Sequence, residues 1–200
     1  GVLGGALSTY AVFVDDDCGV ISGVSACAVG NNRWVTLGAR QAGKLYGLDY
    51  RAEYYWQGGN AAGAGTKVSE GATHAMYGTT HTNSVRGYTA QTNRDAYMFG
   101  LRVGKSFNNV TWKPKVTLWW DYLSGNSDED MSNGDWAAFD TLYDTGHKFY
   151  GFMDLFLGYS GASVNYMGLQ DFAVKVVLKP ADKWTFKADV HNFRTAETIG

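Results

Sequence analysis

Long stretches of this 200-residue chain alternate between apolar and polar side chains with a period of two residues. In residues 45–57, Tyr54 and Trp56 share one face, whereas Arg51 and Glu53 share the other. Successive side chains of a β-strand point to opposite faces, so this period indicates strands; the helical spacing of three and four residues finds no long match. The alternation predicts seven strands, at about residues 3–14, 33–43, 45–57, 94–107, 110–123, 167–179 and 183–195.

The connections between the predicted strands are alternately short and long. Gly, Asn, Pro and Asp mark tight turns at 43–44, 108–109 and 180–182, and long connections cover about 15–32, 58–93 and 124–166. This alternation is typical of an up-and-down antiparallel sheet with one smooth end and one elaborated end, as in outer-membrane barrels. We therefore predict that residues 1–200 are part of a single β-barrel domain and that the long connections are external loops.

The composition is compatible with a barrel in a membrane. No run approaches the roughly 18 apolar residues of a membrane helix, but the strands of a membrane barrel need only about 9–11 residues. A soluble sandwich or a lipocalin-like barrel would show the same alternation. The aromatic residues favour the membrane, because they lie near both ends of the predicted strands, as in the interfacial girdles of such barrels. They include Tyr54, Trp56, Trp120 and Tyr122 at one end, and Trp112 and Trp184 at the other.

A closed bacterial barrel has an even number of strands, eight or more, so seven predicted strands are too few. An open sheet edge in lipid would leave backbone groups unpaired. We therefore expect an all-β, transmembrane, antiparallel up-and-down barrel of which this sequence is a fragment. The net charge of −2 gives no sign of a nucleic-acid partner.

Three stretches carry a family resemblance: "YMFGLRVGKSFNNVTWKPKVTLWWDYLSGN", "FDTLYDTGHKFYGFMD" and "GLQDFAVKVVLKPADKWTFKADVHNFRTAE". Over about residues 94–197 the chain resembles the alginate export family of outer-membrane porins. The resemblance implies a large barrel of about 16–18 strands in the outer membrane of a Gram-negative bacterium. It also implies contact with the lipid bilayer and lipopolysaccharide, and passive diffusion or export of a small or polymeric solute, with an anionic polysaccharide among the candidates.

The polar strand faces would line the lumen and set its selectivity through their charges. The predicted pore-lining bases are Arg40, Arg51, Arg102, Lys113, Lys115, Lys175 and Lys187, and the acids are Asp49, Glu53, Asp121, Asp171 and Asp189. An excess of bases would favour anionic or hydroxylated solutes. Alternatively, the charges pair across strands and hold the wall rigid. For Arg51 both interpretations stay open, whereas Arg102, Lys113 and Lys115 have no adjacent acid in their strands, which favours selectivity.

The stretch 139–154 combines aromatic residues with Gly, Asp and Thr inside the longest predicted connection. Its apolar side chains need a surface to pack against, so we expect it to fold against the barrel mouth or inner wall and to narrow the pore. The predicted constriction residues are Phe139, Tyr143, His147, Lys148 and Tyr150.

Other chemistry is less well supported by the sequence. Cys18 and Cys27 are close together, which favours a disulfide over two free thiols. No Gly-x-Ser-x-Gly or His-Glu-x-x-His motif is present, so we expect neither an enzyme nor a cofactor. The acidic loops leave bound calcium open as an alternative. A scaffold barrel that houses a periplasmic or lumenal partner protein, and a hydrolase using His147, are the alternative functions.

Overall fold

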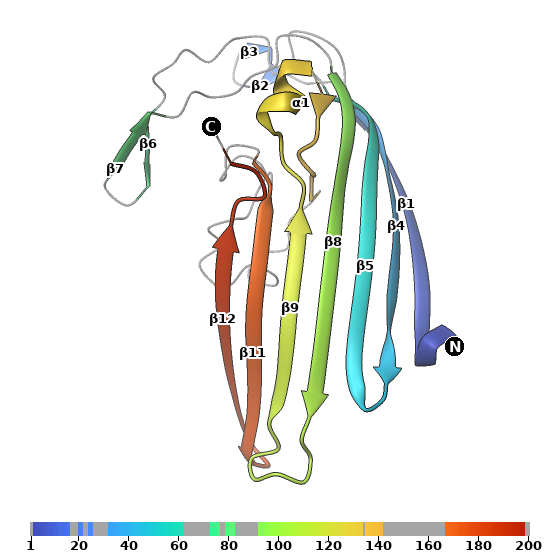
Figure 1. The fold of residues 1–200 in the computed structure, drawn as a ribbon, viewed down its shortest axis with the longest axis vertical. Helices are drawn as coiled ribbons and strands as arrows, with labels where there is room; N and C mark the ends of the chain where they lie inside the picture. The colour runs from blue at the N-terminus through green and yellow to red at the C-terminus, as the bar shows by residue number, and fades with distance from the viewer. Residues whose placement is uncertain are drawn as a thin grey trace.

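The computed structural model describes residues 2–16, 20–21, 24–25, 32–61, 73–76, 79–82, 92–133, 135–141 and 167–198. Its main element is one eight-stranded sheet (Figure 1). The path through the sheet is β1 (Gly5–Asp16), β4 (Asn32–Leu45), β5 (Leu48–Ala61), β8 (Thr92–Ser106), β9 (Lys115–Leu123), β11 (Leu169–Ala181) and β12 (Trp184–Arg194). The eighth strand, β10 (Asp135–Trp136), pairs with β8.

Smaller elements accompany the sheet. A 3-10 turn, η1 (Val2–Gly4), precedes β1, and one short helix, α1 (Asp128–Asn133), follows β9. Two hairpins complete the described elements: β2 (Val20–Ile21) with β3 (Val24–Ser25), and β6 (Thr73–Met76) with β7 (Thr79–Thr82). In the part of the chain that the structure describes, no helix has the length and apolar character needed to cross a membrane.

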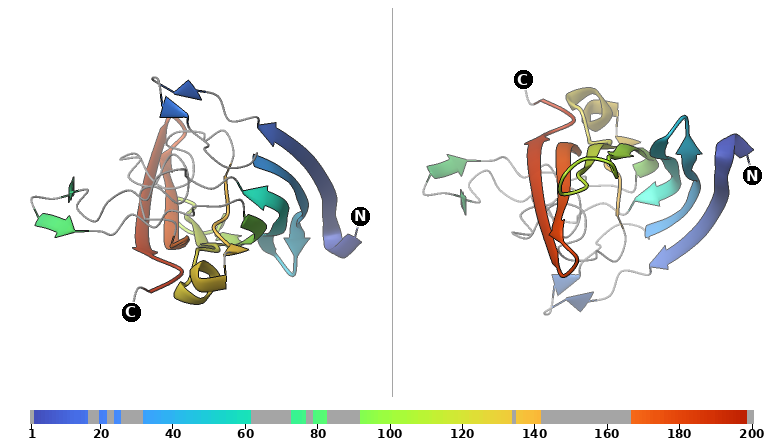
Figure 2. Two further views of the ribbon diagram at one scale, coloured as in Figure 1. Left: turned by 90° about the horizontal axis from the view of Figure 1, so that it is seen from above. Right: turned by 90° about the horizontal axis from the view of Figure 1, so that it is seen from below.

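All neighbours along the path from β1 to β12 are antiparallel, and the strands follow one another in sequence order. Viewed along the strands, the sheet is a curved wall with β1 and β12 at its two edges (Figure 2). The wall is not closed. The prediction of an all-β, up-and-down antiparallel sheet is therefore confirmed, and an open wall of this kind is consistent with part of a larger barrel.

The turn between β4 and β5 differs from the prediction. The sequence favoured residues 43–44, but both lie inside β4, and the turn is formed by Tyr46 and Gly47. These two residues have φ values of 50° and 78°, and positive φ at both positions is the signature of the type I′ hairpin turn. Gly43 instead lies in a paired strand, where a side chain would meet the backbone of Gly5.

The connection between β8 and β9 is also longer than the tight turn predicted at 108–109. Residues 107–114 form a compact loop in which the Phe107 N–H donates to the Pro114 carbonyl at 2.8 Å and the Lys113 N–H donates to the Val110 carbonyl at 2.9 Å. The strand predicted to start at residue 110 therefore starts at Lys115. Pro114 stands just before this strand, so its missing N–H removes no hydrogen bond from the ladder.

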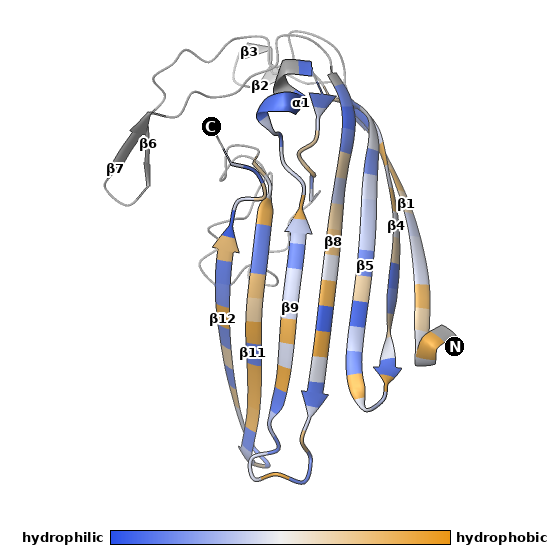
Figure 3. Ribbon diagram, in the orientation of Figure 1, coloured by the Kyte–Doolittle hydropathy of each residue, from blue (hydrophilic) through white to orange (hydrophobic). Residues whose placement is uncertain are grey.

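The two faces of the wall differ in polarity, and the hydropathy of successive residues alternates along the strands (Figure 3). The face that we call outer exposes large apolar side chains, among them Phe13, Leu118, Phe172, Phe186 and Val190. Aromatic rings also pack across strands on this face: Tyr97 stacks on Tyr54 and Tyr122, and Trp120 stacks on Phe172. The other face, which we call inner, carries most of the charged residues of the strands.

Candidate functional site

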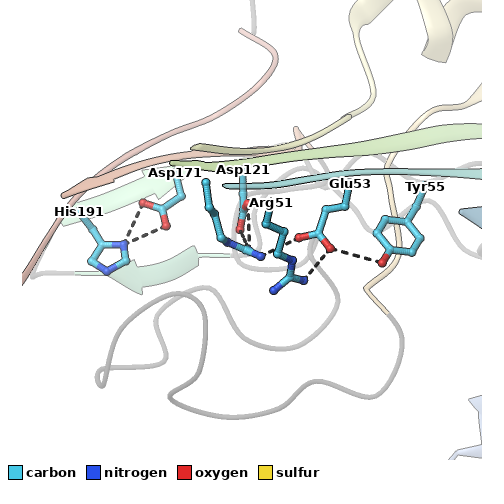
Figure 4. A network of polar contacts seen from close by, with 7 residues as sticks. Arg51, Glu53, Tyr55, Asp121, Asp171 and His191 are labelled. Carbon is cyan, nitrogen blue, oxygen red and sulfur yellow. Dashed lines mark hydrogen bonds and ion pairs between the residues drawn. The ribbon is translucent and has the colours of Figure 1, made fainter. Parts of the chain in front are cut away.

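A chain of ion pairs crosses the inner face at mid-height (Figure 4). Arg102 of β8 bonds Glu53 of β5 at 2.7 Å and Asp121 of β9 at 3.2 Å, and Arg51 bonds the second oxygen of Glu53 at 2.6 Å. The strand register brings the carboxylates together, because Gly100 is the partner of both Glu53 and Asp121. Glu53, Arg102 and Asp121 are all buried. Buried charges need such partners, because water no longer solvates them.

Trp119 extends this network toward β11. The Arg102 guanidinium lies over its ring at 3.4 Å, and the Lys175 ammonium lies 4.3 Å from the same centroid. A ring quadrupole attracts cations in this geometry. Trp119 therefore holds two of the predicted pore-lining bases against the wall.

Acids and bases also pair on both sides of this centre. Asp49 binds Lys44 at 3.0 Å and Lys115 at 2.9 Å, near the end of the sheet with the short connections. On the other side, Lys175 contacts Asp189 at 3.3 Å. His191 places Nδ1 2.9 Å from the Asp171 carboxylate, which is fully buried.

The predicted pore-lining bases thus fall into three groups: bases in ion pairs, bases on the inner face that pair with no described acid, and one base outside the strands. Arg51, Arg102, Lys115 and Lys175 make ion pairs on the inner face. Arg102 and Lys115 have no acid adjacent in their own strands, but neighbouring strands supply two to Arg102 and one to Lys115.

Two further bases, Arg40 and Lys187, stand on the inner face by register, opposite Glu53 and Val177, and neither makes an ion pair with a residue that the structure describes. Lys113 lies in the connection 107–114, outside the strands.

Residues 135–141, which we call the strap, lie at the end of the sheet with the long connections, where they start beside β8 in the wall and then pass onto the inner face. The strap begins with β10, whose Asp135 and Trp136 pair in parallel with Asn93 and Arg94. Gln57 anchors its far end: Nε2 donates to the Asp140 carbonyl at 2.7 Å, and Oε1 accepts from the Asp140 N–H at 2.9 Å. The Gln57 side chain is fully buried, so these two bonds replace water on both sides.

The middle of the strap is fixed by the residues that follow β9. The Asn126 amide oxygen accepts from the N–H groups of Ala137 and Ala138, at 2.7 and 2.9 Å. Ser124 donates its hydroxyl to the Ala137 carbonyl at 2.6 Å, and its own carbonyl accepts from the Phe139 N–H at 3.1 Å. The chain therefore turns back on itself through α1, and residues 137–139 return to the segment that directly follows β9.

Phe139 gives the strap its apolar contact. It is 5% exposed and packs with Ala96, Leu123 and Leu169 on the inner face. Phe139 is the first residue of the stretch that was expected to fold against the mouth or inner wall, and it is the described member of the predicted constriction. Tyr143, His147, Lys148 and Tyr150 lie outside the described residues, as do Cys18 and Cys27.

Sequence reasoning did not single out the anchors Gln57, Ser124 and Asn126. Gln57 was on the predicted polar face, but nothing local shows that its partner lies in another segment. The helix α1 was also not predicted, although its start has a recognisable signal. Ser127 and Asp130 form a reciprocal cap, with the Asp130 N–H on the Ser127 hydroxyl and the Ser127 N–H on the Asp130 carboxylate.

The acids at this end of the sheet form no metal site that can be recognised. Among the described residues, no group of three or more His, Cys, Asp or Glu side chains is arranged to hold a metal ion.

Glu197 follows β12, and its partial burial, together with the charge of Asp130, raises its pKa above that of an ordinary carboxyl group.

An open antiparallel wall with an apolar outer face and a charged inner face defines the class: this is the wall of a membrane channel rather than a soluble sandwich. The family model for alginate export matches residues 4–199, and the chain belongs to the alginate export family. This is a family of outer-membrane porins, concerned with transport and not with enzymatic chemistry. The match also covers the first 90 residues, for which the sequence had suggested no family. No curated protein and no solved structure shows significant similarity to the chain.

Proposed function

We propose that this chain forms part of the wall of an outer-membrane channel that passes anionic or hydroxylated solutes by diffusion. The observation that carries the proposal is the imbalance of charge on the inner face. Asp49, Glu53, Asp121, Asp171 and Asp189 each contact a cationic or imidazole partner. Arg40 and Lys187, in contrast, make no ion pair with a described residue.

Paired charges contribute little net field, because each acid offsets its base. The field that a passing solute meets at close quarters is then dominated by Arg40 and Lys187, which pair with no described acid. This field attracts anionic solutes. The paired polar groups offer hydrogen bonds to the hydroxyl groups of hydroxylated solutes, and neither kind of solute is bound tightly.

The strap supports a second part of the proposal, which is that residues 135–141 and the stretch that follows narrow the pore. Support comes from the two-bond anchor at Gln57 and from the burial of Phe139 against the inner face. A strap held this way occupies space that a plain barrel would leave to solute.

The reversal potential in a planar bilayer under a potassium chloride gradient tests the selectivity. The full-length protein is expected to prefer chloride, and Arg40→Gln and Lys187→Gln are each expected to lower the ratio of anion to cation permeability. Lys105→Gln is the matched control, because Lys105 is exposed and lies against Phe107 in place of an acid. A clear preference of the unmodified channel for potassium would refute the proposal.

A further inference from the structure

Three buried N–H donors lie close to the strap. They are Nε and Nη1 of Arg94 and Nε1 of Trp34, and none has a hydrogen-bond partner among the residues that the structure describes. The two side chains are 6% and 5% exposed, and the guanidinium lies 4.2 Å from the centroid of the Trp34 ring. Such a cluster presents only donors, which is the complement of an anion.

The strap covers this cluster directly. Trp136 is the strand partner of Arg94, and its ring centroid lies 5.6 Å from the guanidinium carbon, so that Arg94 has an indole on two sides. The carboxylate of Asp140, also in the strap, attracts Arg94 electrostatically without accepting a hydrogen bond from Nε or Nη1. The strap thus supplies an opposite charge but leaves the donors unused.

Unused donors make the covered arrangement costly. A buried N–H group that gave up water without gaining a partner keeps its full desolvation penalty, and the penalty is larger for a charged group. A carboxylate can lower this penalty, because its two oxygens match two N–H groups on one edge of a guanidinium, either Nε with Nη2 or Nη1 with Nη2. The donor atoms are shielded from solvent, and Trp136 of the strap lies beside the guanidinium, so movement of the strap would open a path to Arg94.

We propose that Arg94 and Trp34 form a carboxylate-binding site that the strap closes, and that a carboxylate solute releases the strap by pairing with Arg94. A ligand that binds only the released form shifts the equilibrium toward that form. Release needs the loss of a few hydrogen bonds, chiefly those of Gln57 and Asn126, and of the Phe139 contact. The proposal rests on the proposed function for the choice of an anionic solute as the ligand.

Hydrogen exchange of the full-length protein in detergent micelles, followed by mass spectrometry on peptides that cover 135–141, tests this proposal. Sodium glucuronate is the probe; glucose and sodium chloride of equal ionic strength are the reference solutes. Saturating glucuronate is expected to speed exchange in the strap on the order of tenfold, within the range typical of coupled sites. Glucose and chloride are expected to leave it unchanged.

Two variants show whether Arg94 receives the ligand. Arg94→Met should abolish the response, whereas Arg33→Met should retain it, because Arg33 is exposed and bonds Asp15. If Arg94→Met does not fold, Arg94→Lys keeps the charge without the fork and should need a higher glucuronate concentration. No acceleration in the unmodified protein, or an equal response in the Arg94 variants, overturns the proposal. Exchange does not depend on conduction, so this failure is distinct from a failure of the reversal-potential test.

Discussion

The anchor between Gln57 and the strap allows a quantitative prediction. Gln57→Met keeps the length and the apolar stem of the side chain but removes the donor to the Asp140 carbonyl and the acceptor for its N–H. Each hydrogen bond contributes a net stabilisation of about 0.5–1.5 kcal/mol, and the backbone groups left without partners add a desolvation cost. The free energy needed to release the strap should therefore fall by about 2–3 kcal/mol. Because 1.4 kcal/mol corresponds to about a tenfold change in an equilibrium constant, the released strap should become roughly 30- to 140-fold more populated.

Exchange of the Asp140 amide, resolved by fragmentation of the 135–141 peptide, measures this population directly. The matched control is Gln41→Met, because Gln41 lies near the β4–β5 turn, at the other end of the sheet, and donates to the Tyr50 hydroxyl at 3.1 Å. Exchange in β8 should stay unchanged in both variants, which shows that the wall is intact. If Asp140 in Gln57→Met exchanges as slowly as in the unmodified protein, the strap is held by something other than this anchor.

Two further changes test the wall itself. Arg102→Met leaves two carboxylates in a buried site with one guanidinium fewer, so the free energy of unfolding in urea should fall by about 3–5 kcal/mol. The control Lys105→Met changes an exposed side chain and should be nearly neutral. Equal effects of the two substitutions would show that the ion pairs of Arg102 do not stabilise the fold. Gly38→Ala places a methyl group against the Tyr55 ring and should cost about 1–3 kcal/mol. In a Tyr55→Ala background the same substitution should cost little, and strictly additive effects would contradict this contact.

The strands could be predicted from the sequence because their period follows from backbone geometry alone. The places where the prediction was wrong depend on contacts between distant residues. A glycine at 43 reads as a turn in isolation, but the approach of Gly5 explains why it lies inside a strand. Likewise, a Lys at 113 continues the alternation of the following strand, while the loop hydrogen bonds of 107–114 remove it from the sheet.

The candidate site was predictable in type but not in pairing. Alternation placed Glu53, Arg102 and Asp121 on one polar face, yet their contacts depend on the register of three strands. The strap was harder still, because Gln57 and Asp140 meet across 83 positions of sequence. No local pattern encodes such a contact, and the burial of Gln57 that reveals it is seen only in the structure.

The buried bridge through Arg102 has a consequence for assembly of the sheet. A slip of one residue between two strands would turn the apolar side chains inward, so polarity alone forbids it. A slip of two residues keeps every side chain on its correct face, and polarity cannot detect it. It would, however, separate Arg102 from Glu53 or from Asp121 and leave charges unpaired in the interior. These ion pairs therefore distinguish the correct strand register from registers shifted by two residues, and they make the correct register the most stable.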